Sequence, residues 1–167
     1  MIDHLGPPQD PGFDPERRRH RKSRHSWSHP LAIDKAVFTK LSSFCQMMYS
    51  NSGIRLADGL GNSEQGPIFS EDIICFNGSS PADGDSFYFP RISDDLFGVI
   101  PPGSIQMYER LCDTHRFPYD TMVVACLEAA CHFNIISEWT CGGYKEDHQD
   151  GLDLFLGYKD FDKQEVN

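Results

Sequence analysis

The clearest helical pattern in the chain lies at residues 119–132, which read YDTMVVACLEAACH. Apolar side chains recur there at every third or fourth position, a spacing that places them on one face of a helix. Asp120 stands at the amino end, where a carboxylate interacts favourably with the helix dipole. The stretch therefore predicts a helix in which these apolar residues recur at helical spacing: Met122, Val123, Cys126, Leu127, Ala130 and Cys131.

Three other segments show helical spacing. The first begins at Leu31 and runs to a stop signal at Asn51-Ser52-Gly53. The last covers residues 147–157, with apolar side chains directed inward. A short helix is also expected over residues 105–112, after the break at Pro101-Pro102-Gly103.

Short apolar runs between these helices predict three strands. Residues 73–76 end at Asn77-Gly78, and residues 86–91 follow across a polar loop, which predicts an antiparallel pair. Residues 135–139 form the third run. The predicted order is α-β-β-α-β-α, which indicates an α+β fold with a small antiparallel sheet of about three strands packed against two to four helices.

The chain length of 167 residues suits one domain with a tail rather than two complete cores. Residues 6–15 contain four Pro and two Gly, too many for a helix or strand. We therefore expect a disordered tail over residues 1–30, one domain over residues 31–160 and a flexible end over residues 161–167. Twelve Phe residues predict an aromatic-rich core.

The amino end has no apolar stretch of signal-peptide type, and no run approaches the roughly eighteen apolar residues that span a bilayer. We expect a cytoplasmic protein with no membrane contact. The six cysteines are scattered along the chain, which fits reduced thiols in that compartment.

Charge is distributed unevenly within a net charge of −10. Residues 1–30 hold six basic and four acidic residues, whereas the remainder holds nine basic and twenty-one acidic residues. The acidic part repels polyanions, but the basic cluster in the tail can bind phosphates or an acidic partner. That cluster consists of Arg17, Arg18, Arg19, Arg21, Lys22 and Arg24.

Four residues of ligand types that zinc prefers lie within sixteen positions and raise the question of a zinc site: Cys126, Cys131, His132 and Cys141. Cys126 and Cys131 are five residues apart on the predicted helix, so their side chains diverge by about 140° and cannot easily share a metal ion. No glycine-rich loop has the spacing of a nucleotide-binding motif. The sequence therefore predicts neither a metal site nor a cofactor.

Nucleophilic catalysis requires a thiol or hydroxyl, a base and an orienting group that meet in space. Cys141 is the best thiol, because Gly142-Gly143 would leave it exposed. Its candidate partners are His115, His132 or His148 as the base and Asp147 or Asp150 as the orienting group. The catalytic candidates are Cys141, His132 and His148, and the alternative is an ordinary strand-end cysteine.

Three runs carry a resemblance to a known group: residues 74–78, residues 85–91, and Pro118-Tyr119-Asp120 opening a helix. Over about residues 33–157 the chain resembles small uncharacterised proteins encoded by bacteriophages and mobile elements. That group often has Ser-Asp-Gly after the last strand, where this chain has Thr140-Cys141-Gly142-Gly143. The resemblance implies an accessory protein in a bacterial cytoplasm. It carries no known activity, so no functional residue is transferred.

Charge distribution and the lack of a complete catalytic motif together predict a non-enzymatic interaction protein that binds a host or phage protein. The tail would add weak contact with nucleic acid. One alternative is an acidic DNA mimic that inhibits a nucleic-acid enzyme. A second alternative is a small thiol- or metal-dependent enzyme.

Overall fold

The computed structural model describes residues 23–62, 64–79, 84–93, 107–115, 117–142 and 145–161. The predicted tail up to Lys22 lies outside the described residues, and with it five of the six residues of the basic cluster. Within the described part, the chain has the predicted α+β class. No helix there combines the length and the apolar character that crossing a bilayer requires.

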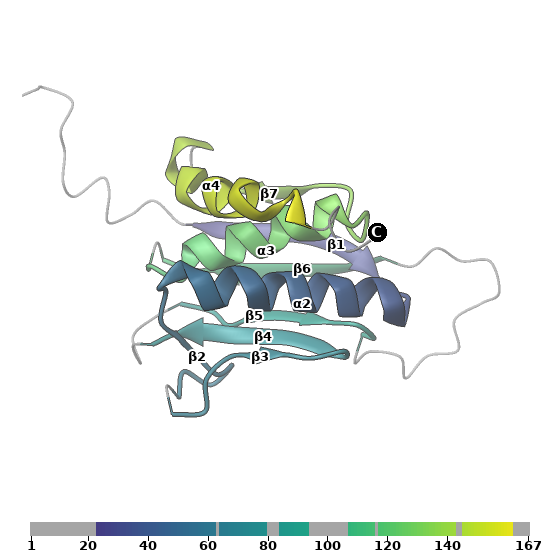
Figure 1. Cartoon of the computed structure of the whole chain (residues 1–167), viewed down its shortest axis with the longest axis horizontal. Helices are drawn as coiled ribbons and strands as arrows, with labels where there is room; N and C mark the ends of the chain where they lie inside the picture. The colour runs from purple at the N-terminus through teal and green to yellow at the C-terminus, as the bar shows by residue number, and fades with distance from the viewer. Residues whose placement is uncertain are drawn as a thin grey trace, which may run out of the picture.

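Three α-helices run in front of the strands in Figure 1. They are α2 (Lys35–Ser52), α3 (Asp120–His132) and α4 (Gln149–Tyr158), and the 3₁₀ helix η1 (Lys145–His148) leads into α4. These three helices correspond to three of the four helical segments that the spacing predicts. Asp34 caps α2, since its side chain accepts a hydrogen bond from the Val37 N–H, and Gly53 ends it in the left-handed conformation.

Seven strands of the described residues form two antiparallel sheets. One has the order β6-β1-β7, and in the other β4 pairs with β2, β3 and β5. Residues 31–33 after β1 bond to residues 91–93 after β5, which links the sheets. The strands are β1 (Arg24–Pro30), β2 (Leu56–Ala57), β3 (Ile68–Phe69), β4 (Ile73–Gly78), β5 (Phe87–Pro90), β6 (Met107–Asp113) and β7 (Trp139–Cys141).

The predicted antiparallel pair is confirmed as β4 and β5, with Ile74 opposite Phe89. The third predicted strand, over residues 135–139, is shifted in the structure to β7. Ile135 and Ile136 are buried, but they belong to the turn region after α3 and not to a strand. In the sequence, two adjacent apolar residues that are buried in a turn give the same signal as a short strand.

Strand β1 corrects the predicted tail boundary, because Arg24–Pro30 form the central strand of the first sheet. Its buried face consists of His25, Trp27 and His29, while the intervening residues are more exposed. Two of the three inward side chains are imidazoles, so the strand lacks the aliphatic alternation that reveals a half-buried strand in a sequence.

The helix predicted over residues 105–112 is wrong, because Met107–Asp113 form strand β6. Seven register positions join β6 to β1, from Arg24 opposite Asp113 to Pro30 opposite Met107. Long-range pairing decides the conformation here over local spacing.

Arg110 lies against two tyrosines, with its guanidinium carbon 4.1 Å from the Tyr108 ring centre and 4.8 Å from that of Tyr88.

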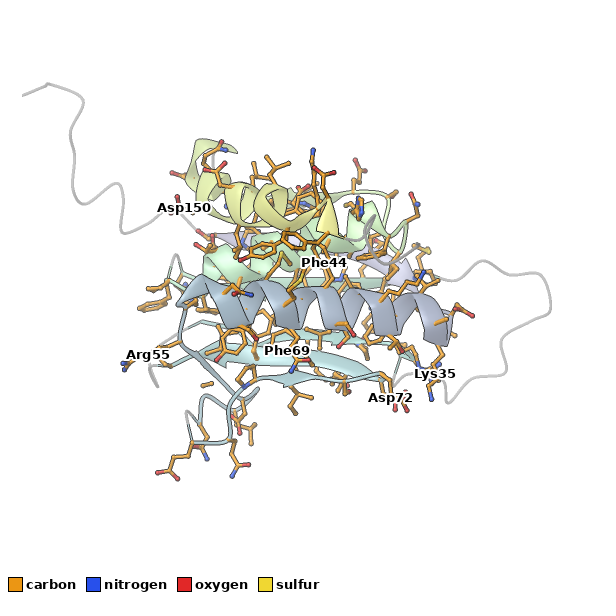
Figure 2. The ribbon with its side chains drawn as sticks, viewed as in Figure 1. Lys35, Phe44, Arg55, Phe69, Asp72 and Asp150 are labelled. Carbon is orange, nitrogen blue, oxygen red and sulfur yellow. The ribbon has the colours of Figure 1, made fainter. Side chains whose placement is uncertain are left out.

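The core between the helices and the sheets is rich in aromatic rings, as twelve Phe residues in the sequence predict. In Figure 2, Phe44 lies on the α4 side of α2 and Phe69 on the side of the second sheet. The Phe44 ring is 6.2 Å from that of Phe155, and the Phe69 ring stacks 5.6 Å from that of Tyr49. Helix α2 therefore packs on α4 through one face and on the sheet through another.

Removal of β1 should prevent folding. A chain that starts at Leu31 lacks the strand that pairs with both β6 and β7, whereas a chain that starts at Ser23 keeps it. We expect a cooperative urea transition from the Ser23 chain and none from the Leu31 chain, measured by circular dichroism. Equal midpoints for the two chains would contradict the central position of β1.

Helix α4 packs closely on α3 at Gly151. A Cβ atom there would lie 2.5 Å from the Val124 Cβ and 2.9 Å from the Thr121 carbonyl oxygen. Gly151→Ala should therefore destabilise the protein by about 1–3 kcal/mol, as overpacking does, although alanine is the better helix former. The measurement is the free energy of unfolding in urea.

Gly157 provides the matched control, because it belongs to the same helix and a Cβ atom there would meet nothing within 4 Å. Gly157→Ala should leave the stability unchanged or raise it by up to about 1 kcal/mol. Equal effects of the two substitutions would show that the Gly151 contact does not limit the packing of α4.

Candidate functional site

Four polar side chains from four separate elements meet between the first sheet and the amino ends of α3 and α4. His25 comes from β1, Asp120 from the first turn of α3, Cys141 from the end of β7 and His148 from the junction of η1 and α4. The two imidazoles and the carboxylate are buried, and Cys141 is half-buried. Buried groups of this kind require partners, and their contacts with one another define the site.

The pairing of β1 with β7 places the first two residues opposite each other. His25 and Cys141 are Cα partners in the antiparallel register. Side chains of directly opposed residues lie on the same face of a sheet, a few ångströms apart. The register therefore brings an imidazole and a thiol together from positions 116 residues apart in the chain.

Asp120 connects both imidazoles. Its Oδ1 atom lies 2.6 Å from His25 Nε2, and its Oδ2 atom lies 3.5 Å from His148 Nδ1. The Thr114 hydroxyl donates a further hydrogen bond to Oδ1. Since Asp120 is the first residue of α3, the amino end of the helix also favours its negative charge.

His148 is held in place by the packing of η1 and α4 on α3. Its ring centre lies 5.1 Å from that of His25 and 5.7 Å from that of Trp139, both in edge-on arrangements. Both ring nitrogens of His148 and the Nδ1 atom of His25 are buried without a hydrogen-bond partner among the described residues, although His148 Nδ1 lies within ion-pair distance of Asp120. Each imidazole therefore contacts the carboxylate through one nitrogen and leaves the other for a further group.

Contacts within the cluster change the protonation of its members. Burial disfavours the imidazolium of His25, but hydrogen bonding to Asp120 and the nearby Cys141 sulfur outweigh burial and raise the pKa of His25 to about 9. Asp120 also raises the pKa of His148, against the effect of burial. Burial alone would raise the pKa of Asp120, yet the two imidazoles and the Thr114 hydroxyl hold it well below its usual range.

One ligand atom from each of His25, Cys141 and His148 can be chosen so that all three lie within 4.8 Å of one another. Around a tetrahedral zinc ion, nitrogen and sulfur ligands lie about 3.3–3.7 Å apart, so side-chain movements of about 1 Å would close this set on a metal. Histidine and cysteine are the ligand types that zinc prefers. Asp120 stands where a metal-ligating histidine needs its second hydrogen-bond partner.

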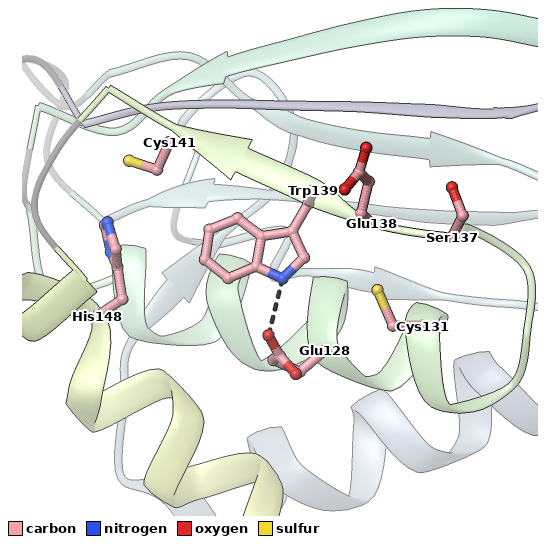
Figure 3. A pocket seen from close by; sticks show the side chains of 7 residues that line it. All are labelled: Glu128, Cys131, Ser137, Glu138, Trp139, Cys141 and His148. Atoms are coloured by element: carbon pink, nitrogen blue, oxygen red, sulfur yellow. Dashed lines mark hydrogen bonds between the residues drawn. The ribbon is translucent and has the colours of Figure 1, made fainter.

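A pocket opens beside the cluster, between α3 and β7 (Figure 3). Cys141 and His148 lie at one end of it, and the Trp139 ring lies between them and the other end. The Trp139 indole N–H donates a 2.8 Å hydrogen bond to Glu128 Oε1. The pocket has a volume of about 410 Å³ and is lined by Glu128, Cys131, Ser137, Glu138, Trp139, Cys141 and His148.

The structure brings together two of the three catalytic candidates, Cys141 and His148. His132 lies elsewhere, exposed at the end of α3, with its ring 5.2 Å from that of Phe133. His115 is exposed on the turn after β6, beside Asp113. The carboxylate that contacts both imidazoles is Asp120, and not one of the orienting acids that the sequence suggests.

The sequence patterns do not identify two residues of the site. His25 falls inside the predicted tail, and Asp120 is assigned only to the start of a helix. The buried strand pattern of His25, Trp27 and His29 is the one signal that could have revealed β1. Of the predicted phosphate-binding residues, Arg24 is the one described, and its guanidinium lies 3.9 Å from the Asp113 carboxylate.

The rejected zinc set stays apart in the structure. Cys126 is fully buried and contacts Cys45 of α2 in the core, whereas Cys131 lines the pocket. The divergence of these two side chains on α3 agrees with their helical spacing. Among the described residues, the group that could hold a metal ion, His25, Cys141 and His148, shares only Cys141 with the set considered from the sequence.

Comparisons with protein-family models, curated proteins and solved structures give no match for this chain. The resemblance to phage and mobile-element proteins therefore stays a prediction.

The contact between His25 and Asp120 predicts a pH-dependent stability. Folding raises the pKa of His25 from 6.5 to about 9. The contribution of His25 to the free energy of unfolding is therefore complete below pH 6.5 and is lost as the pH rises through 9. We expect the metal-free protein to lose about 3 kcal/mol of stability across this window from His25. Urea unfolding at a series of pH values measures it.

Buried thiols such as Cys112 also reduce the stability above about pH 8.5, because folding raises their pKa and they ionise more readily in the unfolded chain. The Asp120→Asn variant separates the two effects, because it removes the carboxylate and keeps the thiols. Its stability should fall less between pH 6.5 and 9 than that of the wild type. If the variant does not fold, NMR titration of the His25 ring protons in the wild type gives the pKa directly, and an unshifted value would contradict the prediction.

Proposed function

We propose that the domain is a zinc-dependent hydrolase in which His25, Cys141 and His148 bind the metal ion. The observation that carries this proposal is that ligand atoms of two imidazoles and one thiol lie within 4.8 Å of one another, with one carboxylate beside both imidazoles. A carboxylate that accepts the second ring N–H orients a ligating histidine and increases its basicity. Asp120 is placed to do this for both ligands.

A metal site accounts for both histidines. A catalytic triad needs one imidazole between an acid and a nucleophile, which would leave His148 without a role. In a zinc site each imidazole would be neutral and would bind through the nitrogen that does not face Asp120, which is Nδ1 of His25 and Nε2 of His148. The charges of the ion, the Cys141 thiolate and the Asp120 carboxylate then also compensate one another.

Three protein ligands leave one coordination position of a tetrahedral ion open, which is the pattern of catalytic zinc sites. A zinc ion bound there would lower the pKa of a water molecule to about 7 and supply hydroxide. Cys141 and His148 line the pocket, so the open position can face it. In hydrolysis the hydroxide oxygen bonds to the carbonyl carbon, the bond to the leaving group breaks, and the leaving group takes up a proton.

Cobalt(II) titration tests the metal site, because a thiolate ligand produces a sulfur-to-cobalt charge-transfer absorption. We expect the metal-free full chain to bind one equivalent and show this band. Cys141→Ser should abolish it, whereas Cys131→Ser, which changes the other cysteine of the same pocket, should retain it. Asp120→Asn should weaken binding by about 10–100-fold.

Failure to bind one equivalent at micromolar concentrations, or a band that survives in Cys141→Ser, would exclude this ligand set. Hydrolysis of p-nitrophenyl acetate by the zinc-loaded protein, and its loss with a chelator, tests the catalytic part. A site that binds zinc without hydrolysis would be structural.

The second candidate is a thiol hydrolase with Cys141 as nucleophile, His25 as base and Asp120 as orienting group. The short contact of His25 with Asp120 and the adjacent Cys141 sulfur favour it. In this case ester hydrolysis would persist in the presence of a chelator and would be lost in Cys141→Ser. The same assay therefore separates the two mechanisms.

The non-enzymatic interaction protein and the acidic DNA mimic stay predictions from charge. On the described surface, acidic side chains also pair with basic ones, as Glu71 does with Lys35 and Asp72 with Arg91. A pull-down that compares the full chain with one starting at Ser23 would test whether the domain or the basic tail binds a partner.

A further inference from the structure

The orientation of the Asp120 carboxylate decides whether one residue can serve both histidines. Its Oδ1 atom faces His25 Nε2 at 2.6 Å, and its Oδ2 atom faces His148 Nδ1 at 3.5 Å. The terminal torsion of an aspartate is broad, so the side chain does not fix this orientation by itself. We propose that Thr114 is the positioning residue that fixes it. The consequence for metal binding rests on the proposed function, whereas the orientation itself does not.

The backbone around Thr114 places its side chain for this role. Thr114 follows directly after β6 and is fully buried. Its N–H donates a 3.0 Å hydrogen bond to the Ser23 carbonyl oxygen, which holds the residue against the start of β1. The β-branched side chain of threonine is stiff about χ1, so a fixed backbone also restricts the hydroxyl. That hydroxyl forms a hydrogen bond with Asp120 Oδ1.

A short backbone path connects this donor with its acceptor. The Phe117 N–H donates to the Thr114 carbonyl oxygen at 3.0 Å, and the Asp120 N–H donates to the Phe117 carbonyl oxygen at 2.8 Å. Two successive turns therefore lead from Thr114 to the first residue of α3. The hydroxyl and the carboxylate are six residues apart in sequence, so these turns set the position of one relative to the other.

The Thr114 hydroxyl has one proton and two acceptors within reach. Besides Asp120 Oδ1, the Ser23 carbonyl oxygen lies 3.3 Å away. A hydrogen bond to an ionised carboxylate is stronger than one to a neutral carbonyl, and the Ser23 oxygen already accepts the Thr114 N–H. The proton therefore goes to Asp120. Two donors, from Thr114 and His25, then converge on Oδ1 and set the direction of Oδ2 towards His148.

In a metal site this orientation affects how tightly the ion is held. The group that accepts the second ring N–H of a ligating histidine orients the ring, and its loss typically weakens metal binding by about 10–100-fold. Thr114 acts on the ligands through Asp120, one hydrogen bond farther from the ion. Its contribution should therefore be smaller, about 3–10-fold in metal affinity.

Thr114→Val tests the orientation in the metal-free full chain. Valine keeps the shape of threonine and the backbone bond to Ser23, and it removes only the hydroxyl. The readout is the ¹H NMR signal of the proton between His25 Nε2 and Asp120, which should exchange slowly with water because the ring is fully buried. We expect this signal to shift or broaden in Thr114→Val. An unchanged signal would overturn the proposal.

Thr114→Ser distinguishes positioning from packing. Serine restores the hydroxyl but lacks the buried methyl group that valine keeps, so the wild-type signal should return in Thr114→Ser. A residue with a packing role alone would give the opposite pattern, with an altered signal in Thr114→Ser and a normal one in Thr114→Val. That pattern would also overturn the proposal.

Thr140→Val is the matched control. Thr140 precedes Cys141 in β7, but its hydroxyl is hydrogen-bonded to that of Ser26 at 2.6 Å, in an exposed position. The same substitution there should leave the His25 signal unchanged. If Thr114→Val does not fold, the wild type decides. The buried Thr114 hydroxyl proton should show a nuclear Overhauser contact with the His25 Nε2 proton, and the absence of this contact would contradict the assignment.

Cobalt(II) titration of the same variants separates this inference from the metal site. Thr114→Val should weaken cobalt binding by about 3–10-fold without moving the thiolate band, because the ligands are the same, and Thr114→Ser should restore the affinity. Wild-type affinity in Thr114→Val would overturn the role in metal binding. If the wild type binds no cobalt but the His25 signal responds to Thr114→Val, the zinc mechanism fails and Thr114 still positions Asp120.

Discussion

The hydrogen bond between Asp120 and His25 connects the helix layer to the central strand. It spans 95 residues of sequence, and both residues are buried. A buried carboxylate is costly without partners, and a buried imidazolium is equally costly. Each group therefore offsets the free-energy cost of burying the other. Their contact fixes the position of α3 relative to β1.

Other features of the site depend on this contact. With His25 held by Asp120, the pairing of β1 and β7 places Cys141 beside the ring, and the packing of α4 on α3 at Gly151 places His148 on the other carboxylate oxygen. Removing one partner would leave an uncompensated polar group, which costs more than the pair contributes. A polar cluster of this kind is a poor way to stabilise a core, and this is one reason to look for its role in chemistry.

The pocket extends the same arrangement outward. Trp139 has one edge on the histidines and donates its indole N–H to Glu128, so it connects the cluster with the rest of the pocket.

Much of the fold was predictable from local patterns. The helical spacing of residues 119–132, the stop at Gly53 and the paired apolar runs that became β4 and β5 depend on neighbours in sequence, and these predictions are confirmed. Strand β6 was not predictable in this way, because residues 107–113 are extended only through their pairing with β1. The buried face of β1 carries two histidines, so hydrophobic periodicity does not reveal it.

The sequence by itself determined the α+β class, the three helices and Cys141 and His148 as members of a candidate site. Only the tertiary structure decided that these two residues meet, that His25 joins them, and that Asp120 contacts both imidazoles. The physical reason is that spacing along a chain describes which side chains share a face of one element. Chemistry at this site depends on four elements whose positions are set by sheet register and helix packing, and neither is encoded in local spacing.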